Sequence, residues 1–314
     1  MSLDHDHEPG GFRLPADAGI GRVRLRVADL ERSLGFYRDL LGMHVAAADG
    51  PRLELSAGAG GRTLVILEEQ PGIARGGRRL GLYHFAVLVP NRRELARLLR
   101  RLLAAGWPLH GGSDHGVSEA LYLDDPDGNG VELYADRPRE RWPVEDGRLA
   151  MFTRPLDAAG VLAELEREPE RPEEPALDPG TIIGHTHLHV SDLGRAEAFY
   201  ADLLGFDVTV RGYPGALFLS AGGYHHHLGA NTWLGPAAAR QTEDAAGLID
   251  WELRLPGPDA GHTAGRLETH LRSRGVEVTA SGGIRRVEDP DGTALIFGGS
   301  PHPTGAPATL ADLG

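Results

Sequence analysis

Histidine is the residue type that most narrows the chemistry open to this chain. The 314 residues include 15 His and no Cys. Disulfides, thiolate metal sites and cysteine nucleophiles are therefore excluded, and any metal must be held by His, Asp or Glu. That donor set favours Fe(II), Mn(II), Zn(II), Ni(II) or Co(II) and argues against an iron–sulfur cluster.

Glu132 stands where a negative charge would be costly. It lies between Val131 and Leu133, in a segment that should form a buried strand. A buried, unpaired carboxylate has to be matched by a cation or become neutral. A metal ion would supply that cation, so Glu132 is a candidate ligand.

Two groups of histidines are candidate partners. His185, His187 and His189 are spaced two residues apart, and in a strand this period places all three on one face. The run 225–227 is His-His-His, and strand alternation would place its first and last members on one face. A neutral imidazole can accept a proton and return it near neutral pH, so these residues could act as acid and base.

The elements that must position these residues follow from two repeated motifs. Residues 24–43 (RLRVADLERSLGFYRDLLGM) match residues 187–206 (HLHVSDLGRAEAFYADLLGF). Each predicts a short strand, an Asp that caps a helix, and an amphipathic helix closed by Leu-Gly. Residues 122–134 and 287–297 each predict a strand, an Asp-Pro-Asp-Gly turn and a second strand.

The chain therefore divides into four modules of one strand, one helix and several strands. The modules begin near Val23, Tyr83, Thr186 and Ile249. Helices are expected over 91–106 in module two and 261–275 in module four. The expected organisation is a mobile tail (1–18), a first domain (19–138), a Pro- and Glu-rich linker with one short helix at 155–168 (139–180), a second domain (181–300) and a second tail (301–314).

Charge and hydropathy limit the partners. Lys plus Arg is 32 and Asp plus Glu is 45, a net charge of −13 that disfavours nucleic acid and anionic membranes. No apolar run approaches the ~18 residues that span a bilayer. The N-terminal sequence MSLDHDHEPGGF lacks the basic and apolar regions of a secretory signal, so we expect a cytoplasmic protein.

Four such modules resemble the vicinal oxygen chelate superfamily, which includes glyoxalase I, bleomycin-resistance proteins and type I extradiol dioxygenases. The resemblance covers nearly the whole folded chain. Residues 82–142 and 222–233 (GGYHHHLGANTW) are similar to the bacterial catechol 2,3-dioxygenase group. The resemblance implies an α+β fold of four βαβββ modules in two tandem glyoxalase-like domains with cupped mixed sheets.

In this superfamily the metal ligands lie on the first and last strands of a module, and two modules face each other around the ion. Modules two and three offer His84, Glu132 and His187, the two-His, one-carboxylate set of a non-haem Fe(II) site. The repeat alignment favours His187, with His185 and His189 as alternatives. The corresponding positions of modules one and four are Arg24, Asp250 and Ile296. Arg cannot ligate and Ile has no donor, so we expect modules two and three to pair around the metal.

Extradiol enzymes also carry a signature from a His through Leu-Tyr and an Asp/Asn-Pro-x-Gly turn to the ligand Glu. Here it runs from His115 through Tyr122 and the turn at 125–128 to Glu132, with Ser113 where the pattern has Gly, Asn, Thr, Ile or Val. The resemblance implies that His115 and Tyr122 contact the substrate oxygens. Tyr122 can hydrogen-bond a ring hydroxyl.

Extradiol enzymes have, in addition, a pocket histidine that acts as acid and base. His227 is the candidate for this role by resemblance, and His225 is the next. Asn231 and Trp233 continue the same face and are expected to shape the substrate pocket.

The function implied by the resemblance is extradiol ring cleavage. Fe(II), or Mn(II) in the same ligands, would bind O2 and a catechol-type or hydroquinone-type aromatic diol and yield a semialdehyde-type product. Such folds commonly self-associate. One alternative is a glyoxalase-like isomerase or lyase, whose sites usually have four protein ligands including two carboxylates. The other is a metal-free binding or drug-sequestering protein, against which the intact ligand set argues.

Overall fold

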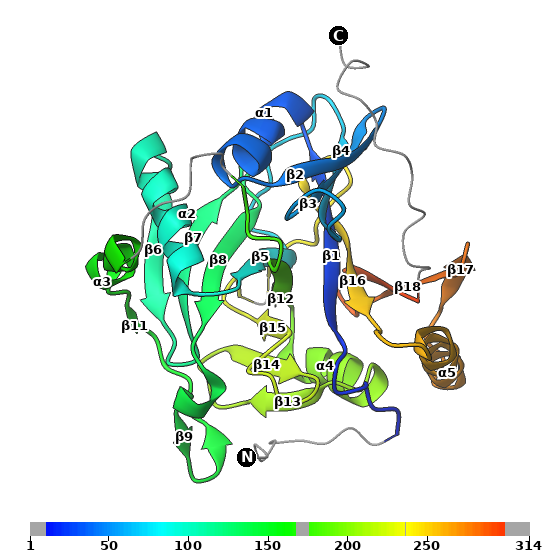
Figure 1. The fold of residues 1–314 in the computed structure, drawn as a ribbon. Helices are drawn as coiled ribbons and strands as arrows, with labels where there is room; N and C mark the ends of the chain where they lie inside the picture. Colours follow the sequence, from blue (N-terminus) through cyan, green and yellow to red (C-terminus); the bar gives the residue numbers. More distant parts are fainter. Residues whose placement is uncertain (1–10, 168–175, 236, 299–314) are drawn as a thin grey trace.

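Two mixed sheets make up the computed structural model, which describes residues 11–167, 176–235 and 237–298 (Figure 1). The strand order of the first sheet is β11-β6-β7-β8-β5-β12-β15-β14-β13. Its strands are β5 (Gly81–Val89), β6 (Leu109–Asp114), β7 (Ser118–Asp124), β8 (Gly130–Asp136), β11 (Arg154–Pro155), β12 (Ile182–His189), β13 (Asp207–Val210), β14 (Ala216–Ser220) and β15 (Leu228–Asn231).

The strand order of the second sheet is β17-β18-β19-β16-β1-β4-β3-β2. Its strands are β1 (Gly19–Val27), β2 (His44–Asp49), β3 (Arg52–Ser56), β4 (Thr63–Glu69), β16 (Gly247–Arg254), β17 (Thr279–Ser281), β18 (Ile284–Glu288) and β19 (Ala294–Phe297). A separate hairpin joins β9 (Val144–Glu145) to β10 (Arg148–Leu149).

The two sheets confirm the module pairing expected from the candidate ligands. Modules two and three share the nine-stranded sheet, where β5 and β12 run antiparallel and His187 faces His84. Modules one and four share the eight-stranded sheet through β1 and β16. Because each sheet takes strands from both halves of the chain, the domain ranges 19–138 and 181–300 remain a prediction.

The expected helices are present, and the ends of α2 follow from capping. α2 (Arg92–Ala105) begins where the Asn91 side chain accepts hydrogen bonds from two backbone amides, and it ends at Gly106, whose φ of 62° suits glycine. α5 (Ala260–Ser273) is the helix of module four. In modules one and three, α1 (Leu30–Leu34) and α4 (Leu193–Glu197) continue into one turn of π-helix, η1 (Gly35–Leu40) and η4 (Ala198–Leu203).

Alternation along the strands separates the core from the site. In β5, Phe85 and Val87 are buried in the main hydrophobic core, which also holds the apolar side chains of α2. The residues that alternate with them, His84 and Ala86, point to the other face of the sheet. In β8 the same alternation sends Glu132 to the face of His84. The core side therefore fixes the register of the strands that carry the candidate ligands.

The segment expected to be a linker is part of the fold. It contains η2 (Arg139–Arg141), the β9–β10 hairpin, the edge strand β11, and a helix formed by α3 (Ala158–Leu162) and η3 (Ala163–Arg167), which matches the short helix expected at 155–168. The predicted tails lie partly outside the described residues. Within 11–18, Phe12 and Leu14 are buried, and the Leu14 amide donates to Gly205 O at 3.0 Å, so this stretch packs on the body of the protein.

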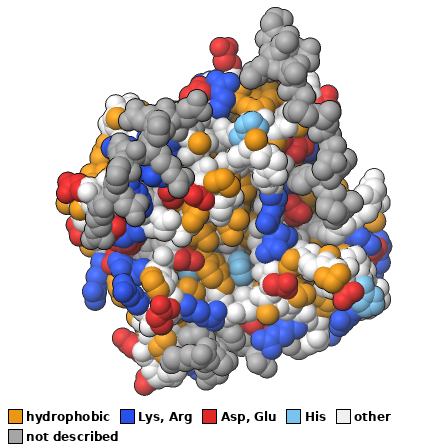
Figure 2. Space-filling model, viewed as in Figure 1, with side chains coloured by type: hydrophobic (Ala, Val, Ile, Leu, Met, Phe, Trp, Pro, Cys, Tyr) orange, Lys and Arg blue, Asp and Glu red, His pale blue; other side chains and the backbone are white. Residues whose placement is uncertain are grey.

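Basic and acidic side chains are interspersed over the face shown in Figure 2. None of the helices within the described ranges is long and apolar enough to cross a membrane.

Candidate metal centre and cavity

A cavity of about 600 Å³ opens on the site face of the nine-stranded sheet. Of the residues singled out from the sequence, those that line it are His84, His115, Tyr122, Glu132, His187 and Trp233. His225, His227 and Asn231 do not line it. His185, which the sequence left as an alternative to His187, also lines it, as does His226, the middle residue of the triple-histidine run.

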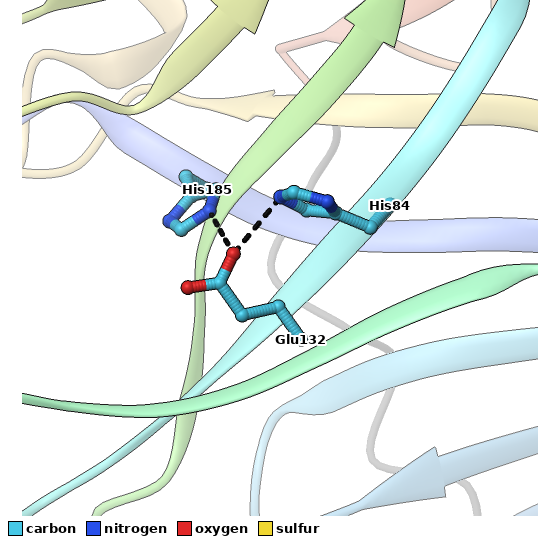
Figure 3. A group of neighbouring side chains, drawn as sticks. All are labelled: His84, Glu132 and His185. Carbon is cyan, nitrogen blue, oxygen red and sulfur yellow. Dashed lines mark hydrogen bonds and ion pairs between the residues drawn. The ribbon is translucent and has the colours of Figure 1, made fainter. Parts of the chain in front are cut away.

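Three side chains meet at one point of the cavity wall (Figure 3). His84 comes from β5, Glu132 from β8 and His185 from β12. Nε2 of His84 lies 2.9 Å from Oε2 of Glu132, and Nε2 of His185 lies 3.1 Å from the same oxygen. All three ligand atoms lie within 4.8 Å of one another, and all three residues are buried.

The two histidines control the charge of the carboxylate. Burial by itself would raise the pKa of Glu132, but the neighbouring imidazoles of His185 and His84 outweigh burial and hold this pKa well below its ordinary value. Glu132 is therefore an anion in the folded protein. The buried negative charge favours a cation at this point.

The donor set fits a divalent metal ion. Two imidazole nitrogens and one carboxylate oxygen suit Fe(II), Mn(II) and Zn(II). His84 Nε2 is buried and has no aligned hydrogen-bond partner in the described part of the chain, although it lies next to Glu132. A buried imidazole nitrogen without such a partner is costly, and a metal ion would remove this cost by binding the nitrogen lone pair.

His185 occupies the position in module three that His84 occupies in module two. Each histidine precedes the N-cap of its module's helix by seven residues, since the caps are Asp192 and Asn91. His187 precedes its cap by five residues and lies outside the three-residue group. Counting from the caps would have selected His185 from the sequence.

The fourth position of this arrangement holds no donor. Ala86 follows His84 by two residues and pairs with Glu132 in β8. In the same way, His187 follows His185 by two residues and pairs with Gly229 in β15. Gly229 is thus the counterpart of Glu132 in module three. A Cβ at Gly229 would lie 2.8 Å from the His187 ring, so His187 fills the space that a longer side chain would need.

Tyr122 and His115 form a hydrogen-bonded pair on the cavity wall. His115 Nδ1 lies 3.1 Å from the carbonyl oxygen of Phe152, which can only accept, so Nδ1 carries a proton. Nε2 then accepts from the Tyr122 hydroxyl at 2.7 Å. Burial and the charge of Glu132 raise the pKa of Tyr122 well above its ordinary value, so its hydroxyl stays protonated.

The three consecutive histidines lie in an irregular segment before β15, so strand alternation does not apply to them. His226 faces the cavity, with its ring 4.2 Å from that of His185. His227 points toward β1 of the other sheet, and its Nε2 would lie 3.4 Å from a Cβ built on Gly19. Burial, followed by the charges of neighbouring histidines, lowers the pKa of His227 to about 3. His225 is fully buried behind His226.

Asn231 and Trp233 shape the site in different ways. Asn231 is fully buried, and its side-chain oxygen accepts from His189 Nδ1 at 2.7 Å and from the Trp233 amide at 3.2 Å. Trp233 lies at the cavity mouth, 42% exposed, with its ring 5.6 Å from that of Tyr83. Asn231 thus positions this part of the wall from behind.

Other cavity residues come from segments that no sequence motif marked. Tyr83 lies beside His84 in β5, and Phe218 lies in β14. The segment between modules two and three contributes four more lining residues: Met151, Thr153, Arg154 and Pro155. The short strand β11 attaches this segment to β6, which brings it over the cavity.

The eight-stranded sheet has no comparable donor set. Arg24 faces Asp250 across β1 and β16, and its guanidinium donates to the carboxylate. Arg22 lies 3.7 Å from the other Asp250 oxygen. Ile296 takes the position that corresponds to Glu132, and Ile66 takes the position that corresponds to Gly229. Arginine therefore supplies the cation here, as expected for a degenerate site.

Comparison with known proteins agrees with the fold. The chain is 44% identical over 285 residues to a catechol-2,3-dioxygenase of Bacillus subtilis (strain 168), covering 89% of this chain and 96% of that protein. A crystal structure of a Bacillus subtilis protein superposes with a TM-score of 0.67 at 14% identity, over 93% of this chain and 88% of that one. Glyoxalase I from Zea mays superposes with a TM-score of 0.56 at 17% identity, over 90% and 92%.

Because the two solved structures share little sequence identity with this chain, their similarity establishes the fold alone. The sequence model of the glyoxalase/bleomycin resistance protein/dioxygenase superfamily matches residues 19–133 and 182–297, which contain all three residues of the metal group. The chain belongs to the glyoxalase/bleomycin resistance protein/dioxygenase superfamily.

Proposed function

We propose that this protein is an extradiol ring-cleavage dioxygenase that holds Fe(II) with His84, His185 and Glu132. The observation that carries the proposal is the three-donor group beside a cavity, with Gly229 in the place of a fourth donor. His185 takes the ligand role in place of His187.

The number of donors favours this chemistry over an isomerase. Three protein ligands on one side of an iron leave positions for both oxygens of an aromatic diol and for O2. When bound, the metal brings diol and O2 together and passes electrons between them, so the encounter becomes intramolecular. A glyoxalase-like site would have a second carboxylate, and the counterpart of Glu132 is glycine.

The protein's own residues prepare the diol. His226 lies on the cavity wall beside His185, where a neutral imidazole can take the proton of a ring hydroxyl and return it later in the reaction. Burial and the surrounding histidines lower the pKa of His226 well below its ordinary value, so the ring is neutral and able to accept. Because the Tyr122 proton is held by His115, the Tyr122 oxygen can accept a hydrogen bond from the ring hydroxyl that keeps its proton.

The cavity wall indicates an aromatic substrate. Tyr83, Tyr213, Phe218 and Trp233 line it together with the polar groups above. Aromatic side chains bind a planar ring by stacking and edge contacts. Catechol is the first substrate to test, because it is named for the relative that shares 44% identity. Substituted catechols and hydroquinones are the next.

The test is O2 uptake by protein loaded anaerobically with Fe(II). With catechol we expect stoichiometric O2 consumption and a yellow product, and His226→Ala should lower kcat by about 10²-fold or more, the usual contribution of a general base. His227→Ala is the matched control, because His227 lies away from the cavity. Metal-loaded protein that binds aromatic diols but consumes no O2 would refute ring cleavage.

A further inference from the structure

Behind the cavity, a chain of hydrogen bonds runs from Asp136 through His225 to His226. His225 Nε2 lies 2.9 Å from Asp136 Oδ1, and His225 Nδ1 lies 2.8 Å from His226 Nδ1. Both rings are buried, whereas the Asp136 side chain is 26% exposed. The chain of hydrogen bonds therefore runs from the cavity wall to a partly exposed carboxylate at the end of β8.

The chemistry of the three groups fixes the direction of each hydrogen bond. Asp136 Oδ1 also accepts from the Tyr224 hydroxyl at 3.2 Å, so this oxygen acts as an acceptor. A His225 ring with one proton then carries it on Nε2 and accepts at Nδ1. His226 consequently donates from Nδ1. Its other nitrogen, Nε2, is left without a proton.

Packing holds this arrangement in place. The His225 ring stacks on Tyr224 at 4.0 Å between ring centroids and meets the edge of Trp142 at 5.3 Å. Trp142 packs in a small cluster of its own with Val117 and Leu149. His225 cannot turn over without breaking both of its hydrogen bonds inside this cluster, and a buried group that loses its partners costs ~1–3 kcal/mol.

We infer that Asp136 and His225 are positioning residues that fix the tautomer of His226, so that the unprotonated Nε2 is the nitrogen available to a hydroxyl of the bound diol. The link to catalysis rests on the proposed function. The tautomer itself is a property of the protein and can be measured separately. The sequence gives no indication of this relationship, because Asp136 lies in β8 and the histidines lie in another module.

The experiment is ¹⁵N NMR of the full chain with ring-labelled histidine, loaded with Zn(II) as a diamagnetic metal. Protonated and unprotonated ring nitrogens have well-separated shifts, and His226→Gln identifies the His226 signals by their loss. In the unsubstituted protein we expect His226 to carry its proton on Nδ1. In His225→Phe, which keeps the ring shape but removes both nitrogens, we expect the proton to move wholly or partly to Nε2.

Asp136→Asn separates the role of the carboxylate from that of the ring. An amide can donate as well as accept, so it no longer fixes the proton on His225, and we expect both tautomers of His226. Tyr224→Phe is the matched control: it removes the other hydrogen bond to Asp136 but keeps the aromatic stack, and the His226 tautomer should not change.

Kinetics then test the consequence. In Fe(II)-loaded protein, His225→Phe should lower kcat with catechol by about 10- to 100-fold, part of what a general base contributes, with little change in KM or in metal content. A His226 proton on Nε2 in the unsubstituted protein, or on Nδ1 in both variants, would overturn the inference. Absence of ring cleavage in a protein with the expected tautomer would refute the proposed function and leave the inference standing.

Discussion

At the scale of single residues, the site depends on a buried carboxylate that would become neutral if no positive or hydrogen-bonding groups surrounded it. Glu132 is buried, yet its pKa is held low by His84 and His185. The same two histidines are the nitrogen donors of the proposed metal site. The carboxylate and the two imidazoles depend on each other, because a metal ion would replace the protons that these groups can otherwise bind.

The assignment of His185 leads to the first prediction. His185→Ala should weaken Fe(II) binding by at least about 10-fold, because it removes a donor, as should Glu132→Gln. His187→Ala should bind Fe(II) with nearly unchanged affinity, because His187 lies outside the donor group. Metal titration under anaerobic conditions measures all three. The opposite order for His185 and His187 would return the ligand role to His187.

At the scale of secondary-structure elements, a repeated contact joins each π-helical turn to an Asp-Pro-Asp-Gly turn. The Tyr37 hydroxyl of η1 donates to Asp125 Oδ2 at 2.8 Å, and the Tyr200 hydroxyl of η4 donates to Asp289 Oδ2 at 2.8 Å. The first contact joins modules one and two, and the second joins modules three and four. These contacts tie the two sheets together at corresponding points.

The two contacts differ in one respect that gives the second prediction. Asp125 Oδ2 also accepts from the Asn129 side chain at 2.8 Å, whereas Tyr200 is the partner that the described residues offer to Asp289 Oδ2. Tyr200→Phe should therefore lower the free energy of unfolding by about 1.5–3 kcal/mol and Tyr37→Phe by about 1 kcal/mol. Urea unfolding monitored by circular dichroism measures both. Equal losses would show that the Asn129 bond does not compensate.

At the scale of the whole molecule, the proposed metal site joins the two halves of the chain. His84 and Glu132 precede the segment 139–180, and His185 follows it. The ion would thus connect β5 and β8 to β12, across the strand pair that holds the nine-stranded sheet together. Metal binding should therefore stabilise the whole fold.

The third prediction follows from this linkage. Fe(II) at about 100 times its Kd should add about 2.7 kcal/mol to the free energy of unfolding and raise Tm. Glu132→Gln should abolish the rise. Asp250→Asn, a change at the corresponding place in the other sheet, should lower the starting Tm through loss of the Arg24 pair but keep the rise. Anaerobic thermal unfolding with and without Fe(II) measures these shifts.

The buried tyrosines give the fourth prediction. Burial, with added contributions from nearby carboxylates or hydroxyls, raises the pKa well above the ordinary value for Tyr37, Tyr122, Tyr134, Tyr200 and Tyr224. Above pH ~10 the unfolded chain loses these protons and the folded chain keeps them, so the free energy of unfolding falls as pH rises. Ultraviolet titration should show these tyrosines ionising together with unfolding. Early ionisation in folded protein would contradict the burial described here.

The sequence by itself determined the modules and their pairing, and it selected two of the three proposed donors. The repeats carry capping and turn residues whose effects are local, and the incompatible residues Arg24 and Ile296 left modules two and three as the functional pair. Glu132 could be recognised because a carboxylate between apolar strand residues needs a cation. These inferences depend on chemistry within one strand or turn.

The tertiary structure placed His185 rather than His187 next to Glu132, a distinction that the repeat alignment missed although the spacing from the helix caps contains it, and it alone placed His226 rather than His227 at the cavity. A period of two places His185 and His187 on one face but does not say which one reaches Glu132. That is decided by the pairing of β12 with β5, which is interrupted by bulges on both sides of these residues. His225 to His227 lie outside any strand, so the direction of each ring is set by what it packs against: Asp136, the cavity and β1. Contacts between distant segments decide such directions, and local periodicity does not contain them.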